Sequence, residues 1–457
     1  MDATLVTGWE ALCQRLASAF TQPTFLTFLH IATGWVLCRS RPTVTNLVCT
    51  IGANLLGHVA KHWTTYERFF YRAVWSLDEV SRLLLVHVVA PLVEAHAVER
   101  VIDLKIDDTT CGRCGKHVAY AGYFKDASAS NTLKTVVHWA HNWVIGSVGL
   151  RPKRWPRWVI GLPVLFVLYR KRPDCDAKHP FMTRQEIAAR MIRDVREALP
   201  DWEIRIAADG QYATGVVVRE AAAAQSNLVS RIRSDAAIYK LPPKRRRHKR
   251  GRRPKKGKRL PTPRQLAVRR KKGWRTIQVR IYNKVVKRKV LPVVCLWYHV
   301  SKDRPIKLVI IRDPAGEQAD DFAFCTDPTV SEVEIVERFA ARWTVEETIH
   351  DGKQHGGLER VQGWCPKTVV RQAPMALVVQ TLVKAWYLNY VARRKGTVPG
   401  GADDRNWLPH KDHPSFLDML ASLRWVLWNH RININSTLKG RVRELLKTLR
   451  FMLCRAA

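Results

Sequence analysis

The sequence predicts an α/β protein built from several parts, and three observations lead to that prediction. From about residue 100, short β-branched segments replace helical periodicity, and strand-like and helical segments then alternate. A strand-rich, strongly basic stretch interrupts this alternation. With 457 residues, the chain is also too long for one ordinary core, so two or three domains are expected.

The first 98 residues have a helical pattern. Apolar residues recur at intervals of three and four through residues 25–37 and 45–62. Capping boxes at Thr64–Glu67 and Ser76–Glu79 predict two short helices with a tight connection. Such a pair could present one helix to a DNA groove, although a plain helical packing module has the same signature. We expect residues 1–98 to form a helical DNA-binding domain.

Strands are predicted next, at residues 100–108, 134–150, 159–169 and 203–212. The run 159–169 is the longest apolar run, and it is too short to span a bilayer. A capping box at Thr183–Glu186 opens a helix between the last two strands. Asp107 is predicted to close the first strand and Asp209 the last, and the carboxyl ends of strands are where ligands bind in α/β sheets. We assign residues 99–213 to the first part of the core.

A β-rich insertion is predicted at residues 214–325, with a basic arm at 242–275. The stretch 236–302 has 25 Lys and Arg residues and no acidic residue, within a chain of formal charge +38. Charge of this size favours a nucleic-acid partner, although a basic protein at an anionic membrane surface would have the same balance. The segment 244–259 is expected to bind DNA phosphates without reading sequence, although a nuclear-localisation signal looks similar. Its phosphate-contacting candidates are Lys244, Arg245, Arg246, Arg247, Lys249, Arg250, Arg252, Arg253, Lys255, Lys256, Lys258 and Arg259.

Two smaller features have competing interpretations. Trp297, in an apolar strand of the insertion, could stack on an unpaired base, but a core position is commoner for such a residue. Cys111, Cys114 and His117 could supply three zinc ligands, but no fourth ligand is evident and an ordinary turn is the alternative. The ten cysteines show no disulfide spacing and the N-terminus has no export signal, so a cytoplasmic location without membrane association is expected.

After the insertion, a helix is expected to start at the capping box Ser331–Glu334 and to reach Gly352 or the pair Gly356–Gly357. Phe339, Glu346 and Lys353 are spaced by seven residues and therefore share one face, with Arg342 one turn before Glu346. Residues 326–385 are assigned to the second part of the core and 386–457 to a helical C-terminal region. Three acids from three elements, Asp107, Asp209 and Glu346, could together hold two divalent ions.

The sequence resembles one group of bacterial insertion-sequence DDE transposases. In that group, the helix with the third acid has the order Tyr, Arg, Glu and Lys, separated by two, three and six other residues. Phe339, Arg342, Glu346 and Lys353 have these offsets, with Phe in place of the usual Tyr. The segments IDDTT around Asp107, ADGQY around Asp209 and HWTTYERFFYRAVWS upstream agree, and the resemblance covers about residues 25–385. Asp107 is favoured over its neighbour Asp108, because the family pattern places Thr or Ser two residues after the acid.

The resemblance implies an RNase H-like catalytic core interrupted by the β-rich insertion. Asp107, Asp209 and Glu346 become ligands of two Mg²⁺ ions, for which Mn²⁺ can substitute, and Arg342 and Lys353 become phosphate contacts. The implied partners are the double-stranded DNA of transposon ends and of the target, with a homodimer joining two ends. The alternatives are a catalytically inactive, transposase-derived DNA-binding regulator and a stand-alone RNase H-like nuclease.

Overall fold

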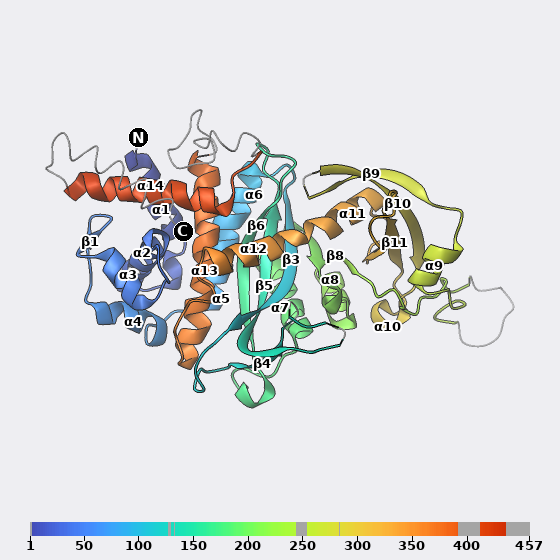
Figure 1. Ribbon diagram of the computed structural model, residues 1–457, viewed down its shortest axis with the longest axis horizontal. Helices are drawn as coiled ribbons and strands as arrows, with labels where there is room; N and C mark the ends of the chain where they lie inside the picture. Colours follow the sequence, from blue (N-terminus) through green and yellow to red (C-terminus); the bar gives the residue numbers. More distant parts are fainter. Residues whose placement is uncertain are drawn as a thin grey trace.

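The computed structural model describes residues 2–126, 129–131, 133–243, 254–282, 284–391 and 412–435. Three regions lie side by side along its longest axis (Figure 1). N-terminal helices form one end, a large sheet with helices on both faces forms the middle, and the strands of the basic insertion form the other end. A mixed α/β architecture, as the sequence predicts, is therefore confirmed.

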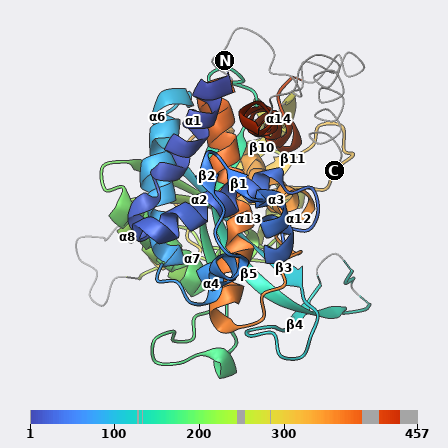
Figure 2. The same ribbon diagram turned by 90° about the vertical axis from the view of Figure 1, so that its left-hand side faces the viewer.

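The N-terminal region is helical apart from one short hairpin. Its elements are α1 (Asp2–Gln14), η1 (Ala17–Ala19), α2 (Gln22–Leu37), α3 (Val44–Ile51), β1 (Asn54–Leu55), β2 (His58–Val59), α4 (Trp63–Tyr71), α5 (Leu77–Leu83), η2 (Leu84–Val89) and α6 (Ala90–His96). Two helices from the other end of the chain, α13 (Pro366–Trp386) and α14 (Phe416–Asn435), pack against α1 (Figure 2). Trp386 donates its indole N–H to the Leu5 carbonyl at 2.9 Å, which joins these distant segments.

One ten-stranded sheet runs through the rest of the molecule. Its strands are β3 (Val101–Gly112), β4 (Gly122–Lys125), β5 (Val137–Leu150), β6 (Ile160–Tyr169), β7 (Glu203–Ala208), β8 (Asn227–Arg231), β9 (Arg275–Ile281), β10 (Lys284–Cys295), β11 (Ile306–Arg312) and β12 (Asp321–Cys325). The order is β4–β5–β3–β7–β8–β12–β11–β10–β9, and β6 also pairs with β5. Strands β3, β7 and β8 are parallel, whereas β5 and β6 are antiparallel to their neighbours. Because β12 pairs with β8, the strands of the insertion continue the same sheet.

The position of Asp107 in its strand differs from the prediction. Asp107 does not close β3, which continues to Gly112, because the longer β5 still pairs with it as far as Ala140. The parallel partner β7 does end here, with Ala208 opposite Ile106. Asp107 therefore lies in mid-strand, beside the point where β7 gives way to Asp209.

The remaining helices cover the sheet and connect its strands. They are η3 (Arg172–Asp174), α7 (Arg184–Ala198), η4 (Gly210–Tyr212), α8 (Gly215–Ala223), α9 (Pro263–Arg269), α10 (Tyr298–Ser301), α11 (Glu332–Ala341), α12 (Trp343–Gln354) and η5 (Tyr387–Val391). Helix α12 crosses β3, β5 and β6 (Figure 1), and the long, buried α13 packs on β6. No helix in the described ranges combines the length and the apolar character needed to cross a bilayer.

The structure agrees with some of the predicted helix starts and differs from others. At Thr183 both bonds of the capping box form, and the Ser331 hydroxyl accepts from the Glu334 amide. Ser76 is the N-cap of α5, but its side chain makes no capping bond. The start predicted at Thr64 is wrong, because α4 begins at Trp63 and the Thr64 hydroxyl bonds the His62 ring instead.

The helix carrying the third acid is not continuous. It begins after Ser331 as predicted, but α11 ends at Ala341 and α12 begins at Trp343, with Arg342 between them. The two halves pack on different strands: α11 lies against β8, β9, β11 and β12, and α12 against β3, β5 and β6. The prediction that Phe339, Glu346 and Lys353 share one face of a single helix is therefore wrong.

Candidate active site

Asp107, in the middle of β3, lies beside Asp209, which directly follows the end of β7. The parallel pairing of Ile106 with Ala208 brings the next residue of each strand together. Side chains alternate along a strand, so Asp107 and Asp108 point to opposite faces. Asp107 faces the junction between α11 and α12, where it meets Arg342, and Asp108 faces α7, where it meets Arg184.

Burial dominates the electrostatics of Asp107. Its side chain is 15 % exposed. Burial raises the pKa of Asp107 to about 7; the backbone N–H of Asp108, at 2.9 Å, and the Arg342 guanidinium lower it, while the charges of Asp108 and Asp209 raise it. A carboxyl group in this setting binds either a proton or a nearby cation at neutral pH.

Arg342 links Asp107 to Glu346. Its Nη1 atom lies 2.7 Å from Glu346 Oε1 and 3.6 Å from Asp107 Oδ2, and all three side chains are largely withdrawn from solvent. The break between α11 and α12 places this guanidinium over β3. Two carboxylates from distant parts of the chain thus converge on one cation.

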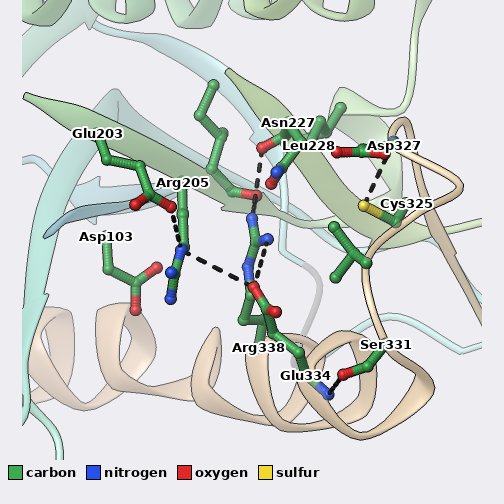
Figure 3. Close-up of polar contacts among 12 residues, drawn as sticks. Asp103, Glu203, Arg205, Asn227, Leu228, Cys325, Asp327, Ser331, Glu334 and Arg338 are labelled. Atoms are coloured by element: carbon green, nitrogen blue, oxygen red, sulfur yellow. Dashed lines mark hydrogen bonds and ion pairs between the residues drawn. The ribbon is translucent and has the colours of Figure 1, made fainter. Parts of the chain in front are cut away.

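A network on the same face of the sheet fixes α11, and with it the position of Arg342 (Figure 3). Arg338, one turn before Arg342, is buried and donates to the carbonyls of Ile206 in β7 and Asn227 in β8, at 3.2 and 3.3 Å. Glu334 accepts from Arg338 at 3.4 Å and lies 3.8 Å from Arg205. Close packing against backbone carbonyls leaves α11 little freedom to shift.

Asp108, the alternative first acid, has its oxygens occupied by protein donors. Oδ2 accepts from Arg184 and Asn142, both at 2.8 Å. Oδ1 accepts from the Tyr212 hydroxyl at 2.9 Å and from Gln211. These four donors come from β5, α7 and η4, so Asp108 ties these elements to β3.

Lys353 and Phe339, the other two residues of the spaced set, contact neither Asp107 nor Glu346 directly and have other partners. Lys353 donates to the Thr110 carbonyl and pairs with Glu359, both at 2.7 Å. Phe339 packs at the edge of a separate apolar cluster under the insertion strands, with the Arg231 guanidinium 5.9 Å from its ring centre. Lys353 lines the cleft described next, and Phe339 is not among its lining residues.

A cleft of about 840 Å³ opens beside α12. Asp107, Glu346 and Lys353 line it, and so do Asp351 and Lys384, of which sequence reasoning did not select Lys384. Lys384 is buried in α13, donates to the Gly161 carbonyl at 3.0 Å and lies 3.7 Å from Asp351. A lone lysine within the apolar run MALVVQTLVKAW was the signal that could have identified it.

The described ranges contain no group of three or more His, Cys, Asp or Glu side chains close enough to hold a metal ion. Asp107 and Glu346 converge, but Asp209 does not complete a triad with them in this arrangement. Cys111, Cys114 and His117 form no such group among the described residues either, with Cys111 buried in β3 and Cys114 exposed.

The remaining candidates are in the insertion. Trp297 is 8 % exposed and packs edge-to-face on Phe324, so stacking on a base would require it to leave the core. Lys255, Lys258 and Arg259 are exposed, and the Lys256 ammonium lies 4.2 Å from the Tyr239 ring centre. The candidates from Lys244 to Arg253 lie outside the described residues.

Comparison with known proteins gives one result that bears on this site. A family model described as DDE superfamily endonuclease matches residues 15–285. The match includes Asp107 and Asp209 and ends before Glu346. None of the curated proteins compared matches the chain at a significant level.

Proposed function

The chain belongs to the DDE superfamily endonucleases, and from this premise we propose that it is a DNA transposase. It would bind the terminal inverted repeats of a mobile element, cut the DNA there and join the ends to target DNA. The observation that carries the proposal is the convergence of Asp107 and Glu346 on Arg342, beside Asp209. Two-metal phosphodiester chemistry requires ligands that hold two divalent ions close together, and carboxylate oxygens suit this role.

The strand arrangement supports an RNase H-like core for this enzyme. In β6–β5–β3–β7–β8, three antiparallel strands adjoin two parallel ones, and α7 and α12 cover opposite faces. We propose that residues 99–213 and 326–385 form the core, that 1–98 contact DNA, and that 214–325 and 386–457 are the insertion and the C-terminal region. The offsets of Arg342, Glu346 and Lys353 favour the Tyr-Arg-Glu-Lys group, acting as a dimer on paired ends.

DDE endonucleases typically use divalent metal ions, and the residues present fit such a cofactor. The donors are carboxylate oxygens, which Mg²⁺ prefers, and the Arg342 guanidinium already lies where two of them converge. Asp107, Asp209 and Glu346 would hold two Mg²⁺ ions, or Mn²⁺ in their place. When bound, such ions activate the attacking oxygen and stabilise the leaving oxygen of the phosphodiester.

Cationic side chains of the chain would position the DNA. Arg342 pairs with both acids in the absence of other cations, and near DNA its guanidinium would turn to a backbone phosphate, leaving the carboxylates to the metal. Lys353 would exchange its contact with Glu359 for a phosphate in the same way. Both residues would thereby hold the scissile strand against the acids.

The test of this function uses the purified chain and the DNA that flanks its gene on both sides. In Mg²⁺ we expect cuts at the ends of matching inverted repeats and joining of those ends to a target plasmid, and we expect neither in EDTA. Binding without cutting would indicate the inactive DNA-binding regulator. Cutting that ignores the repeats and yields no joined product would indicate a stand-alone nuclease.

The basic arm should supply affinity without sequence preference. We expect deletion of residues 244–259 to weaken binding to repeat-end DNA and random DNA by similar factors, because phosphate contacts release counterions whatever the sequence. The slope of log Kd against log salt concentration should also decrease, measured by fluorescence anisotropy over a salt series. If the deletion left the affinity for random DNA and its salt slope unchanged, the arm would not be a phosphate-binding segment.

A further inference from the structure

A second cavity is distinct from the catalytic cleft. Its volume is about 440 Å³, within the range of about 300–1,000 Å³ that ligand pockets have. The start of α5, strand β6, the loop 175–182, helix α7 and the start of α13 contribute to its walls. It shares no lining residue with the catalytic cleft.

Positive charge exceeds negative charge in this cavity. Two of its arginines are already bound: Arg190 pairs with Asp78 at 2.6 Å, and Arg371 donates to backbone carbonyls around residues 70–75. Asp78 is the one carboxylate among the lining residues. Arg170, Lys178 and Lys367 also line the cavity, and none has an ion pair with a carboxylate in the described part of the chain.

Two donors at the cavity have no acceptor among the described residues. Trp143 is 2 % exposed and its indole N–H is unpaired. The Nη1 atom of Arg170 is buried and also unpaired, while the guanidinium stacks on Tyr120 with its central carbon 4.2 Å from the ring centre. Buried donors almost always have an acceptor, so two unpaired donors beside one cavity make it a candidate site for a ligand that carries acceptors.

We propose that this cavity binds the phosphate group of a nucleotide ligand. Indole, guanidinium and ammonium groups can only donate here, and a phosphate offers several acceptor oxygens together with negative charge. Stacking on Tyr120 holds the Arg170 fork in one orientation, which suits bidentate contact with an oxyanion. Phe166, Leu168 and Met182 provide an apolar wall against which the rest of a nucleotide can pack.

The same phosphate chemistry could come from a DNA strand or from a free nucleotide. Trp143, at the cavity, pairs in register with Thr109, which lines the catalytic cleft, so neighbouring residues of β5 and β3 take part in the two sites. A DNA strand bound in the cleft would reach the cavity with phosphates farther along the strand. A free nucleotide or inorganic phosphate would reach it directly from solvent.

The test measures ligand binding without divalent metal, so its result does not depend on whether the chain cuts DNA. Inorganic phosphate is titrated by calorimetry against chloride at equal ionic strength, and a labelled single-stranded oligonucleotide is then competed with dGMP. We expect Arg170→Gln to weaken phosphate binding by about tenfold or more, because a charge-assisted contact is lost. Trp143→Phe, which removes only the N–H donor, should weaken it by about threefold to tenfold.

Arg172→Gln is the matched control. Arg172 is two residues from Arg170 and stacks on Phe181 at the same 4.2 Å, but it does not line the cavity. This variant loses the same charge and should bind phosphate as the unmodified chain does. If the occupant is a DNA strand, the oligonucleotide should bind far more tightly than dGMP, and this difference in affinity should be smaller in Arg170→Gln. If the occupant is a free nucleotide, dGMP should bind more tightly than the oligonucleotide. Equal phosphate affinity in the Arg170→Gln, Trp143→Phe and Arg172→Gln variants would overturn the proposal.

Discussion

Glu346→Gln should reduce DNA cleavage in Mg²⁺ by about 1,000-fold or more while leaving the fold and DNA binding intact. The amide is nearly isosteric with the carboxylate, but it has no charge with which to hold a divalent ion or to neutralise Arg342. Two-metal chemistry loses its ion when one charged ligand is removed, and single contacts of this kind are worth orders of magnitude in rate. The measurement is single-turnover cleavage of repeat-end DNA, with binding followed by anisotropy.

Glu347→Gln is the control for this experiment, because Glu347 is the next residue of α12 and lines the same cleft but has no contact with Arg342. Its cleavage rate should stay within about threefold of the unmodified chain, as expected for a carboxylate outside the metal site. If Glu346→Gln cleaved at a near-normal rate and Glu347→Gln or Asp351→Asn did not, the third carboxylate would be reassigned to that residue.

Asp107→Asn and Asp108→Asn should have opposite effects on stability. Asp107→Asn should abolish cleavage but raise the free energy of unfolding of the metal-free protein at pH 8, because the buried carboxylate, with its pKa raised to about 7, is ionised there. The gain should be smaller at pH 5. At that pH the native carboxyl is already protonated, so the folded state no longer carries the cost of a buried charge.

Asp108→Asn should lower the free energy of unfolding by about 2–3 kcal/mol, because it breaks the ion pair with Arg184 and turns an amide N–H₂ toward donor groups. Urea denaturation at both pH values and cleavage assays on both variants distinguish the two roles. A destabilised Asp107→Asn together with a stable but inactive Asp108→Asn would make Asp108 the first catalytic acid.

The sequence by itself determined much of the local structure. The strand with Asp107, the strand ending before Asp209, the buried strand β6 and the helix starts at Thr183 and Ser331 are where their patterns predict them. These features depend on residues close together in the chain, since apolar alternation and capping boxes act over a few positions. The offsets of Arg342, Glu346 and Lys353 are likewise local, because they are read from residues close together in the chain.

Only the tertiary structure decided how these elements meet. Strand β3 continues past Asp107 because β5, some 30 residues later in the chain, still pairs with it. The helix breaks at Arg342 because its two halves pack on different strands, and this break brings the guanidinium between Asp107 and Glu346. Contacts between distant segments likewise bury Trp297 against Phe324 and hold Lys384 at the cleft through the Gly161 carbonyl. Each outcome depends on contacts between residues distant in sequence, whose burial and register no local periodicity encodes.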